Sequence, residues 1–378
     1  MKRLFILTGL LLLTGALFNR TIAQNRENQV REQSIKYQRL MAYIDAFYVD
    51  TVNLQKLTED AIIKALSDLD PHSVYITKEE VDEMNEPLEG GFFGIGIQFT
   101  ILRDTLAVVA IVPGGPSEKA GLMAGDRIVS VDGENIAGKK LSNTEVRKRL
   151  KGEEGTIVKV GVLRGHENMD FRIIRGKIPI YSIDATYMLD KTTGYIKLSR
   201  FAATTIDEFE EAVKKLQAQG MKDLILDLQT NGGGYMGAAI GIADHLLDGR
   251  KMIVYTDGVN SGRREEYSTP IGLLQGGRVV VLIDGNSASA SEIVSGAVQD
   301  WDRGVLVGRR SFGKGLVQRQ FPLTDGSMVR LTIAHYYTPS GRCIQKPYSK
   351  GEEDYEAELY TRYRSGEMVS ADSIVVND

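Results

Sequence analysis

The sequence predicts a chain of several domains, with a helical region, an α+β region and an α/β region in that order. Apolar residues recur at helical spacing before residue 88, and short strands split by turns fill residues 89–177. Strands then alternate with helices over residues 178–347, which is typical of a largely parallel sheet covered by helices. With 378 residues, of which 42% are hydrophobic and 25% charged, the chain is long enough for two or three domains.

Composition excludes some classes of function. The net charge of -4 gives no electrostatic basis for binding nucleic acid, which needs a basic face. The single cysteine, Cys343, excludes an intrachain disulfide framework. The sequence contains no His/Asp/Glu cluster with metal-ligand spacing, so it predicts neither a metal site nor another cofactor.

Residues 1–23 have the pattern of an export signal. Lys2 and Arg3 form a charged start, residues 4–18 are mostly apolar, and Ala23 ends a small-residue cleavage site. We therefore expect export to the periplasm or cell envelope. About fifteen apolar residues are short for a spanning helix, which needs roughly twenty. If the signal stayed uncleaved, the protein would be membrane-associated.

Residues 24–88 are predicted to be an N-terminal helical region. Apolar residues at i, i+3, i+4 and i+7 run from Tyr37 to Tyr48, and residues 54–69 form a second amphipathic pattern. Pro71 then breaks the helix. A lone histidine beside a helix stop is usually a polar turn residue, and we interpret His72 in that way rather than as a catalytic base.

The strand-rich region covers residues 89–177. Short apolar strands separated by turns are expected at 97–102, 106–111, 126–131 and 157–164. Two short helices are expected between them, at 116–121 and 144–150.

The α/β region covers residues 178–347. Its helices are predicted at 205–219, with Thr205 as N-cap and Gly220 as the stop, and at 234–247. Its strands are predicted at 194–199, 224–228, 252–255 and 279–283, and all four are assigned to one largely parallel sheet.

Three serines, Ser287, Ser289 and Ser291, lie between a buried strand and a helix. At such a turn, free N–H groups can hold a developing negative charge. A serine becomes a nucleophile only when a base takes its proton. Lys314, flanked by glycines and followed by apolar residues, can serve if desolvation lowers its pKa. Gln318, four residues further along an expected strand, could accept a hydrogen bond from its amine.

The runs 286–292 and 312–318 resemble those of the carboxyl-terminal processing peptidases, also called tail-specific proteases. The resemblance extends from about residue 43 to residue 347. It implies a crotonase-like αβ core and a serine endopeptidase with a Ser–Lys dyad. Ser289 would be the nucleophile, Lys314 the base and Gln318 its partner. Ser287 and Ser291 would be cap or turn residues.

The same resemblance assigns an oxyanion hole. Residues 227–234 match the family's Asp-Leu-Arg-x-Asn-Pro-Gly-Gly except at Gln229 and Gly232. The backbone N–H of Gly233 would be one donor, and that of Ala290, next to the nucleophile, the other.

Residues 89–177 resemble a PDZ domain, most distinctively over residues 120–133. Gly94, Ile95, Gly96 and Ile97 match the loop that captures a peptide's terminal carboxylate, while the adjoining strand edge pairs with the peptide. The implied partners are polypeptide substrates bound by their C-termini. In this family the N-terminal helices commonly form dimer contacts, so a homo-oligomer is expected, and a regulatory adaptor is a further candidate partner.

Several other interpretations are weaker. Residues 232–237 fit a dinucleotide-binding fingerprint but lie mid-chain and do not account for the serine turn. Residues 308–314 resemble a phosphate loop, but a strand rather than a helix follows. Ser311 to Lys314 mimic an S-x-x-K motif, but the glycine before the lysine disrupts the helix that would bring Ser and Lys together. His245 and His335 are candidates for a Ser-His-Asp triad, although each is more simply a structural residue. A non-catalytic PDZ scaffold would require loss of the serine, lysine or glutamine, and all three are present.

Residues 348–378 form an acidic tail. The family usually carries a Gly-Ile-x-Pro-Asp segment after the match to residues 338–347, and this sequence lacks it. The sequence therefore predicts either a truncated chain or a C-terminal edge that is built differently.

Overall fold

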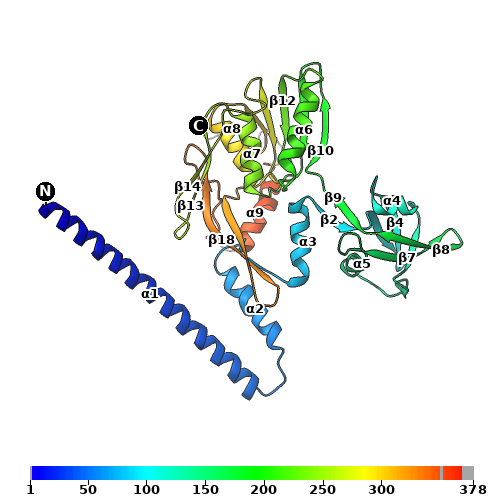
Figure 1. The fold of residues 1–378 in the computed structure, drawn as a ribbon, viewed down its shortest axis with the longest axis horizontal. Helices are drawn as coiled ribbons and strands as arrows, with labels where there is room; N and C mark the ends of the chain where they lie inside the picture. Colours follow the sequence, from blue (N-terminus) through cyan, green and yellow to red (C-terminus); the bar gives the residue numbers. More distant parts are fainter. Residues whose placement is uncertain (1, 350–351, 368–378) are drawn as a thin grey trace. The chain divides into compact units, whose positions relative to one another are not determined.

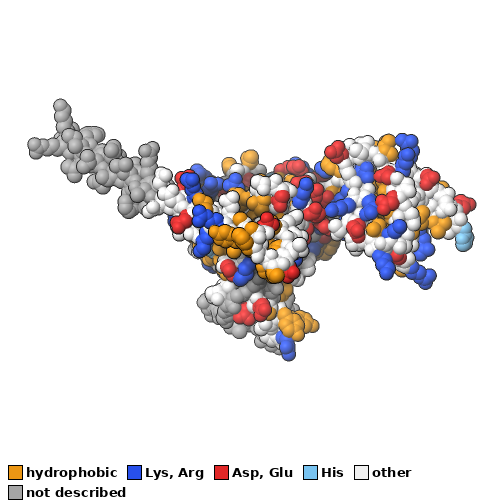
Figure 2. Space-filling model, turned by 90° about the horizontal axis from the view of Figure 1, so that it is seen from below, with side chains coloured by type: hydrophobic (Ala, Val, Ile, Leu, Met, Phe, Trp, Pro, Cys, Tyr) orange, Lys and Arg blue, Asp and Glu red, His pale blue; other side chains and the backbone are white. Residues whose placement is uncertain are grey.

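The computed structural model describes residues 2–349 and 352–367, apart from the side chains of residues 2–23, 352 and 356. The chain divides into two compact units, residues 1–69 and residues 70–378 (Figure 1). On the face shown in Figure 2, basic and acidic side chains of the described residues are interspersed.

The first unit consists of two helices, α1 (Lys2–Phe47) and α2 (Leu54–Ser67). Asn53 caps α2 by accepting a hydrogen bond from the Lys56 N–H at 3.0 Å. The apolar stripe predicted on α1 is exposed, at 50% for Leu40 and 80% for Phe47. Within the part of the chain that the structure describes, no helix combines the length and the apolar character needed to cross a bilayer. The predicted signal falls where side chains are not described, and its cleavage stays a prediction.

The second unit begins with a turn, the strand β1 (Val74–Ile76) and the helix α3 (Lys78–Glu89). The buried Asp70 carboxylate organises the turn, because one of its oxygens accepts hydrogen bonds from the N–H groups of His72 at 2.8 Å and Ser73 at 2.9 Å. The predicted helix stop at Pro71 is therefore present, and its residues join the same unit as the α/β region.

Residues 91–179 form an antiparallel six-stranded sheet, two helices and a two-stranded ribbon, as expected for the strand-rich region. Val160, Ile173 and Ile128 are fully buried at its core. The sheet strands are β3 (Ile97–Leu102), β4 (Thr105–Ile111), β5 (Arg127–Val131), β6 (Glu134–Asn135), β7 (Ile157–Arg164) and β8 (Glu167–Ile174). The ribbon is β2 (Gly91–Gly94) with β9 (Gly176–Pro179), and the helices are α4 (Pro116–Ala120) and α5 (Asn143–Leu150).

The α/β region has a five-stranded sheet in the order β10-β11-β12-β15-β16. Four of these strands are parallel, and β10 pairs antiparallel at one edge. Leu226, Ile242 and Val294 are fully buried between the sheet and its helices. The strands are β10 (Ile183–Met188), β11 (Thr193–Leu198), β12 (Asp223–Asp227), β15 (Val279–Ile283) and β16 (Val305–Gly308); the helices are α6 (Thr205–Gln217), α7 (Met236–Leu246) and α8 (Ala290–Asp300).

A second, antiparallel sheet was not predicted, and the assignment of residues 252–255 to the parallel sheet is wrong. These residues belong to β13 (Met252–Asp257), which pairs antiparallel with β14 (Arg264–Tyr267) and β18 (Met328–Tyr337). β1 and β17 (Leu316–Pro322) also pair with β18. An apolar run predicts a strand but not its partners, and here one partner, β18, lies about eighty residues further on.

The described part of the C-terminal tail is a helix, α9 (Glu352–Arg364), whose Tyr355 and Arg362 side chains are buried. This helix occupies the C-terminal edge, and the two alternatives of a truncated chain and a differently built edge stay predictions. Residues 350–351 and 368–378 of the predicted tail lie outside the described residues.

Candidate active site

The three serines of the strand-to-helix turn have different environments. Ser287 and Ser291 are fully buried, and their hydroxyls donate to the backbone carbonyls of Leu228 at 2.8 Å and Asn231 at 2.9 Å. Ser289 is partly exposed and has a φ of 55°, in the left-handed region that is costly for a residue with a side chain. The turn thus holds two serines as structural residues and presents the middle one at the start of α8.

Ser289, Lys314 and Gln318 line one cavity of about 530 Å³, together with the glycines 232–234. Lys314 lies just before β17 and Gln318 lies within it, so two separate elements carry the nucleophile and base candidates. Among the described residues, no hydrogen bond joins the Ser289 hydroxyl to the Lys314 amine. The tertiary fold therefore brings the three predicted residues together, and their catalytic roles stay predictions.

The Lys314 amine is held by an amide. Its Nζ donates to Gln318 Oε1 at 2.9 Å, as the sequence spacing suggested, and Gln318 Nε2 donates in turn to the backbone carbonyl of His72. Burial lowers the pKa of Lys314 from 10.5, and the positive charge of Arg330 lowers it further, against the opposing charges of Asp70 and Glu292. A lowered pKa is what a lysine needs to serve as a general base.

The Glu292 carboxylate is hydrogen-bonded to both the serine turn and the segment before β17, a role that was not predicted from the sequence. Its Oε2 accepts from the Ser289 and Lys314 N–H groups, both at 2.8 Å, and its Oε1 from the Gly313 N–H and the Ser311 hydroxyl, both at 2.7 Å. Burial raises the pKa of Glu292, and these four donors act in the opposite direction. The capping-box spacing of Ser289 and Glu292 was the available signal.

The two predicted oxyanion donors differ in this structure. A Cβ on Gly233 would lie 2.8 Å from the Ser289 Cβ, so the glycine loop lies directly against the candidate nucleophile. The Gly233 N–H, however, donates to Asn231 Oδ1 at 2.9 Å. The Ala290 N–H has no acceptor among the described residues. Ala290 is therefore free to donate, whereas Gly233 must first release Asn231.

The histidines lie outside the cavity lining. His72 Nε2 lies 2.7 Å from the Tyr355 hydroxyl, and His245 Nε2 lies 3.3 Å from Glu210 Oε1. His335 lies in β18, within the antiparallel sheet. No group of His, Cys, Asp and Glu that could hold a metal ion occurs in the described part of the chain.

The predicted peptide-binding residues Gly94, Ile95, Gly96 and Ile97 line a second cavity, of about 440 Å³. Leu150 and Lys151, at the end of α5, also line this cavity. Glu83 and Glu86 of α3 also line this cavity, where they pair with Arg147 and Lys151. The cavity lining therefore combines apolar side chains with two ion pairs.

The sequence is similar to those of known peptidases. The model of peptidase family S41 matches residues 192–356, and the PDZ domain model matches residues 94–174. The carboxy-terminal-processing protease of Bartonella bacilliformis is 34% identical over 91% of this chain and 80% of that protein. The carboxy-terminal processing protease CtpB of Bacillus subtilis is 33% identical over 82% of this chain and 65% of that protein. Among solved structures, the photosystem II D1 C-terminal processing protease has 31% identity and a TM-score of 0.47, over 82% of this chain and 83% of that chain.

Proposed function

Because the chain belongs to peptidase family S41 and contains a PDZ domain, we propose that it cleaves polypeptides near their C-termini with a Ser289–Lys314 dyad. The multidomain fold class and the class of serine-type endopeptidase predicted from the sequence are confirmed by these matches. The observation that carries the proposed dyad is the shared cavity, which is lined by a partly exposed serine at positive φ and a partly buried lysine of lowered pKa.

The proposed reaction begins with neutral Lys314. Its amine takes the proton of the Ser289 hydroxyl while the serine oxygen attacks the scissile carbonyl carbon. Lys314 then gives this proton to the leaving amine, and water hydrolyses the acyl-enzyme in a second, equivalent cycle. Gln318 accepts one N–H of the amine and so orients its lone pair.

The oxyanion is stabilised by backbone N–H groups. Ala290 supplies the first donor, because its N–H has no acceptor among the described residues and lies at the start of α8. Gly233 supplies the second when its N–H exchanges Asn231 Oδ1 for the substrate oxygen.

Substrate selection is assigned to the PDZ domain. The loop Gly94, Ile95, Gly96 and Ile97 would bind the terminal carboxylate of the substrate. The side chain of the substrate's last residue would enter the apolar part of the same cavity. Export to the periplasm or cell envelope, a homo-oligomer formed through the exposed apolar stripe of α1, and a regulatory adaptor complete the proposal.

The test is cleavage of an unfolded protein with an apolar C-terminus by the chain beginning at Gln24. Ser289→Ala and Lys314→Ala should both abolish cleavage while leaving the far-UV circular dichroism spectrum and the melting temperature unchanged. Cleavage at the parent rate by either variant would disprove the dyad. A parent chain that binds the C-terminal peptide without cutting any protein would favour the non-catalytic scaffold instead. Amidation of the substrate C-terminus should raise KM if the PDZ loop binds a carboxylate.

A further inference from the structure

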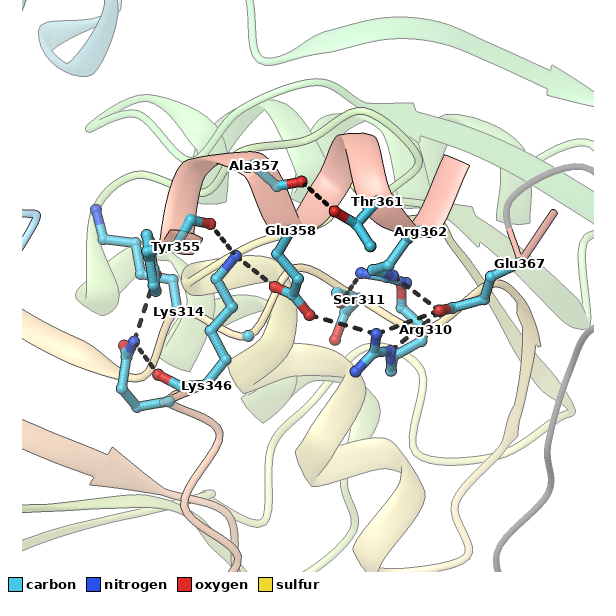
Figure 3. A network of polar contacts seen from close by, with 12 residues as sticks. Arg310, Ser311, Lys314, Lys346, Tyr355, Ala357, Glu358, Thr361, Arg362 and Glu367 are labelled. Atoms are coloured by element: carbon cyan, nitrogen blue, oxygen red, sulfur yellow. Dashed lines mark hydrogen bonds and ion pairs between the residues drawn. The ribbon is translucent and has the colours of Figure 1, made fainter. Parts of the chain in front are cut away.

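Helix α9 docks on the segment that carries Lys314. The Arg362 guanidinium donates to the backbone carbonyls of Arg310 at 2.6 Å and Ser311 at 3.1 Å (Figure 3). Glu358 pairs with Lys346 at 2.6 Å and with Arg310 at 3.3 Å. These contacts fasten the helix to the backbone just before the candidate base.

Tyr355 of α9 is buried, with 5% of its surface exposed. Its ring packs edge-on against His72, with 5.2 Å between ring centres, and Lys346 Nζ lies 4.0 Å above it. The hydroxyl accepts from Gln345 Nε2 at 3.3 Å and lies 2.7 Å from His72 Nε2. Because the hydroxyl already accepts one hydrogen bond, its own proton is available for His72.

Two chains of hydrogen bonds lead from Tyr355 to Lys314. The first runs through His72, whose backbone carbonyl accepts from Gln318 Nε2 and so turns Gln318 Oε1 toward the Lys314 amine. The second runs through Gln345, whose Oε1 accepts from the Gly315 N–H at 2.9 Å, one residue beyond Lys314. One phenol therefore supports both the side chain and the backbone of the candidate base.

We propose that Tyr355, together with His72, is a positioning pair for the general base, so that the docked C-terminal helix is part of the catalytic apparatus. The proposal rests on the Ser289–Lys314 dyad proposed above. An amide has one accepting end and one donating end, and an amine poised to take a proton needs the accepting end. The His72 carbonyl selects that orientation, and Tyr355 keeps His72 in place.

The charges around the pair identify the group that would report on it. Lys314 faces Arg330 of β18, Glu292 of α8, and Asp70 and His72 of the turn before β1; His72 also faces Lys346. Burial, Lys314 and Lys346 lower the pKa of His72 to about 4, and burial raises the pKa of Tyr355 to about 12. Between about pH 4 and pH 12 both members of the pair are therefore uncharged. A shift in the acid limb of a pH–rate profile would then reflect a change in the pKa of Lys314.

The experiment compares Tyr355→Phe with Tyr360→Phe, in the full chain with the substrate used above. Tyr360 lies on the same helix and is 63% exposed, so its variant makes the same chemical change without touching the pair. Tyr355→Phe should lower kcat/KM about tenfold near neutral pH, the effect of one lost hydrogen bond in a preorganised site. Its acid limb should move to higher pH, since a less well-held Lys314 regains water and its pKa rises. Tyr360→Phe should match the parent in both respects.

The control Lys314→Ala separates two kinds of failure. Parent activity in Lys314→Ala would disprove the dyad itself. If Lys314→Ala is inactive but the acid limb of the pH–rate profile of Tyr355→Phe matches that of the parent, only the positioning role is overturned. A loss that is equal at every pH and follows a lower melting temperature would also overturn it, because the helix would then serve stability alone.

A double-mutant cycle supplies the last check. His72→Phe replaces the imidazole with another aromatic ring and keeps the backbone carbonyl, but it removes the bond to Tyr355. It should shift the acid limb as Tyr355→Phe does. The double variant should lose no more than Tyr355→Phe alone, because Tyr355 also supports the second chain through Gln345. Additive losses would mean that the two residues act independently, which the proposal excludes.

Discussion

Replacing Glu292 with glutamine should damage folding and catalysis together. The carboxylate is 2% exposed and accepts four hydrogen bonds, two at each oxygen. A glutamine keeps one accepting oxygen and turns an NH₂ group toward two of these donors. The NH₂ group would take the place of Oε1 and face Ser311 and Gly313. The Ser311 hydroxyl can rotate and accept a hydrogen bond from it, but the Gly313 N–H would be left without an acceptor.

The magnitude follows from these contacts. One buried donor left unpaired costs about 1–3 kcal/mol, and weakening hydrogen bonds made to a charge costs about 1.5–3 kcal/mol more. We therefore expect the free energy of unfolding to fall by about 3–5 kcal/mol. Because Oε2 binds the backbone N–H groups of both Ser289 and Lys314, kcat should also fall in the fraction that stays folded.

The assay combines urea unfolding, followed by circular dichroism, with single-turnover cleavage below the unfolding transition. Glu211→Gln, an exposed glutamate on α6, is the matched control and should leave both measurements unchanged. The reasoning would be refuted if the free energy of unfolding of Glu292→Gln lay within about 1 kcal/mol of the parent value and kcat were unchanged. It would mean that Glu292 is protonated in the folded protein, since a neutral acid and an amide bind their surroundings in nearly the same way.

Three further outcomes are expected. Gly234→Ala should unfold the chain or lower its stability by more than about 3 kcal/mol, because a Cβ at φ 147° would overlap the Phe201 carbonyl. Gly237→Ala is the control and should not destabilise, because its Cβ would meet no atom within 4 Å. Equal melting temperatures of the two variants would contradict the backbone conformation at Gly234. Arg330→Met should move the acid limb of kcat/KM to higher pH, since removing the positive charge lets the pKa of Lys314 rise toward 10.5; an unchanged pH profile would mean that Arg330 does not act on the base. In the PDZ domain, Arg164 hydrogen bonds lower the pKa of Asp126 below 3.8, so this pair stabilises the fold above that pH and the stabilisation is lost as pH falls through the lower, folded value. Arg164→Met should therefore flatten the fall in urea midpoint between about pH 4 and pH 2, and a parent-like slope would count against the pair.

Local patterns were enough to predict several elements of the site. An apolar strand, a serine-rich turn and a helix pattern follow one another in the sequence and place Ser289 at a helix start. This could be predicted because turns and helix caps are determined by neighbouring residues. The spacing of Lys314 and Gln318 along a strand likewise suggested their hydrogen bond, which is present at 2.9 Å. The domain order and most of the helices and strands followed from hydrophobic periodicity for the same reason.

Contacts between distant segments could not be predicted in this way. The His72 carbonyl that orients Gln318 lies 246 residues before it, and Tyr355 reaches His72 across 283 residues. The antiparallel partner of β13 and the Asn231 side chain on the Gly233 N–H were missed as well. The sequence alone determined which residue types stand at the site and on which kind of element. Only the tertiary structure decided how the candidate base is held, because hydrogen bonding and burial depend on groups that meet after the chain has folded.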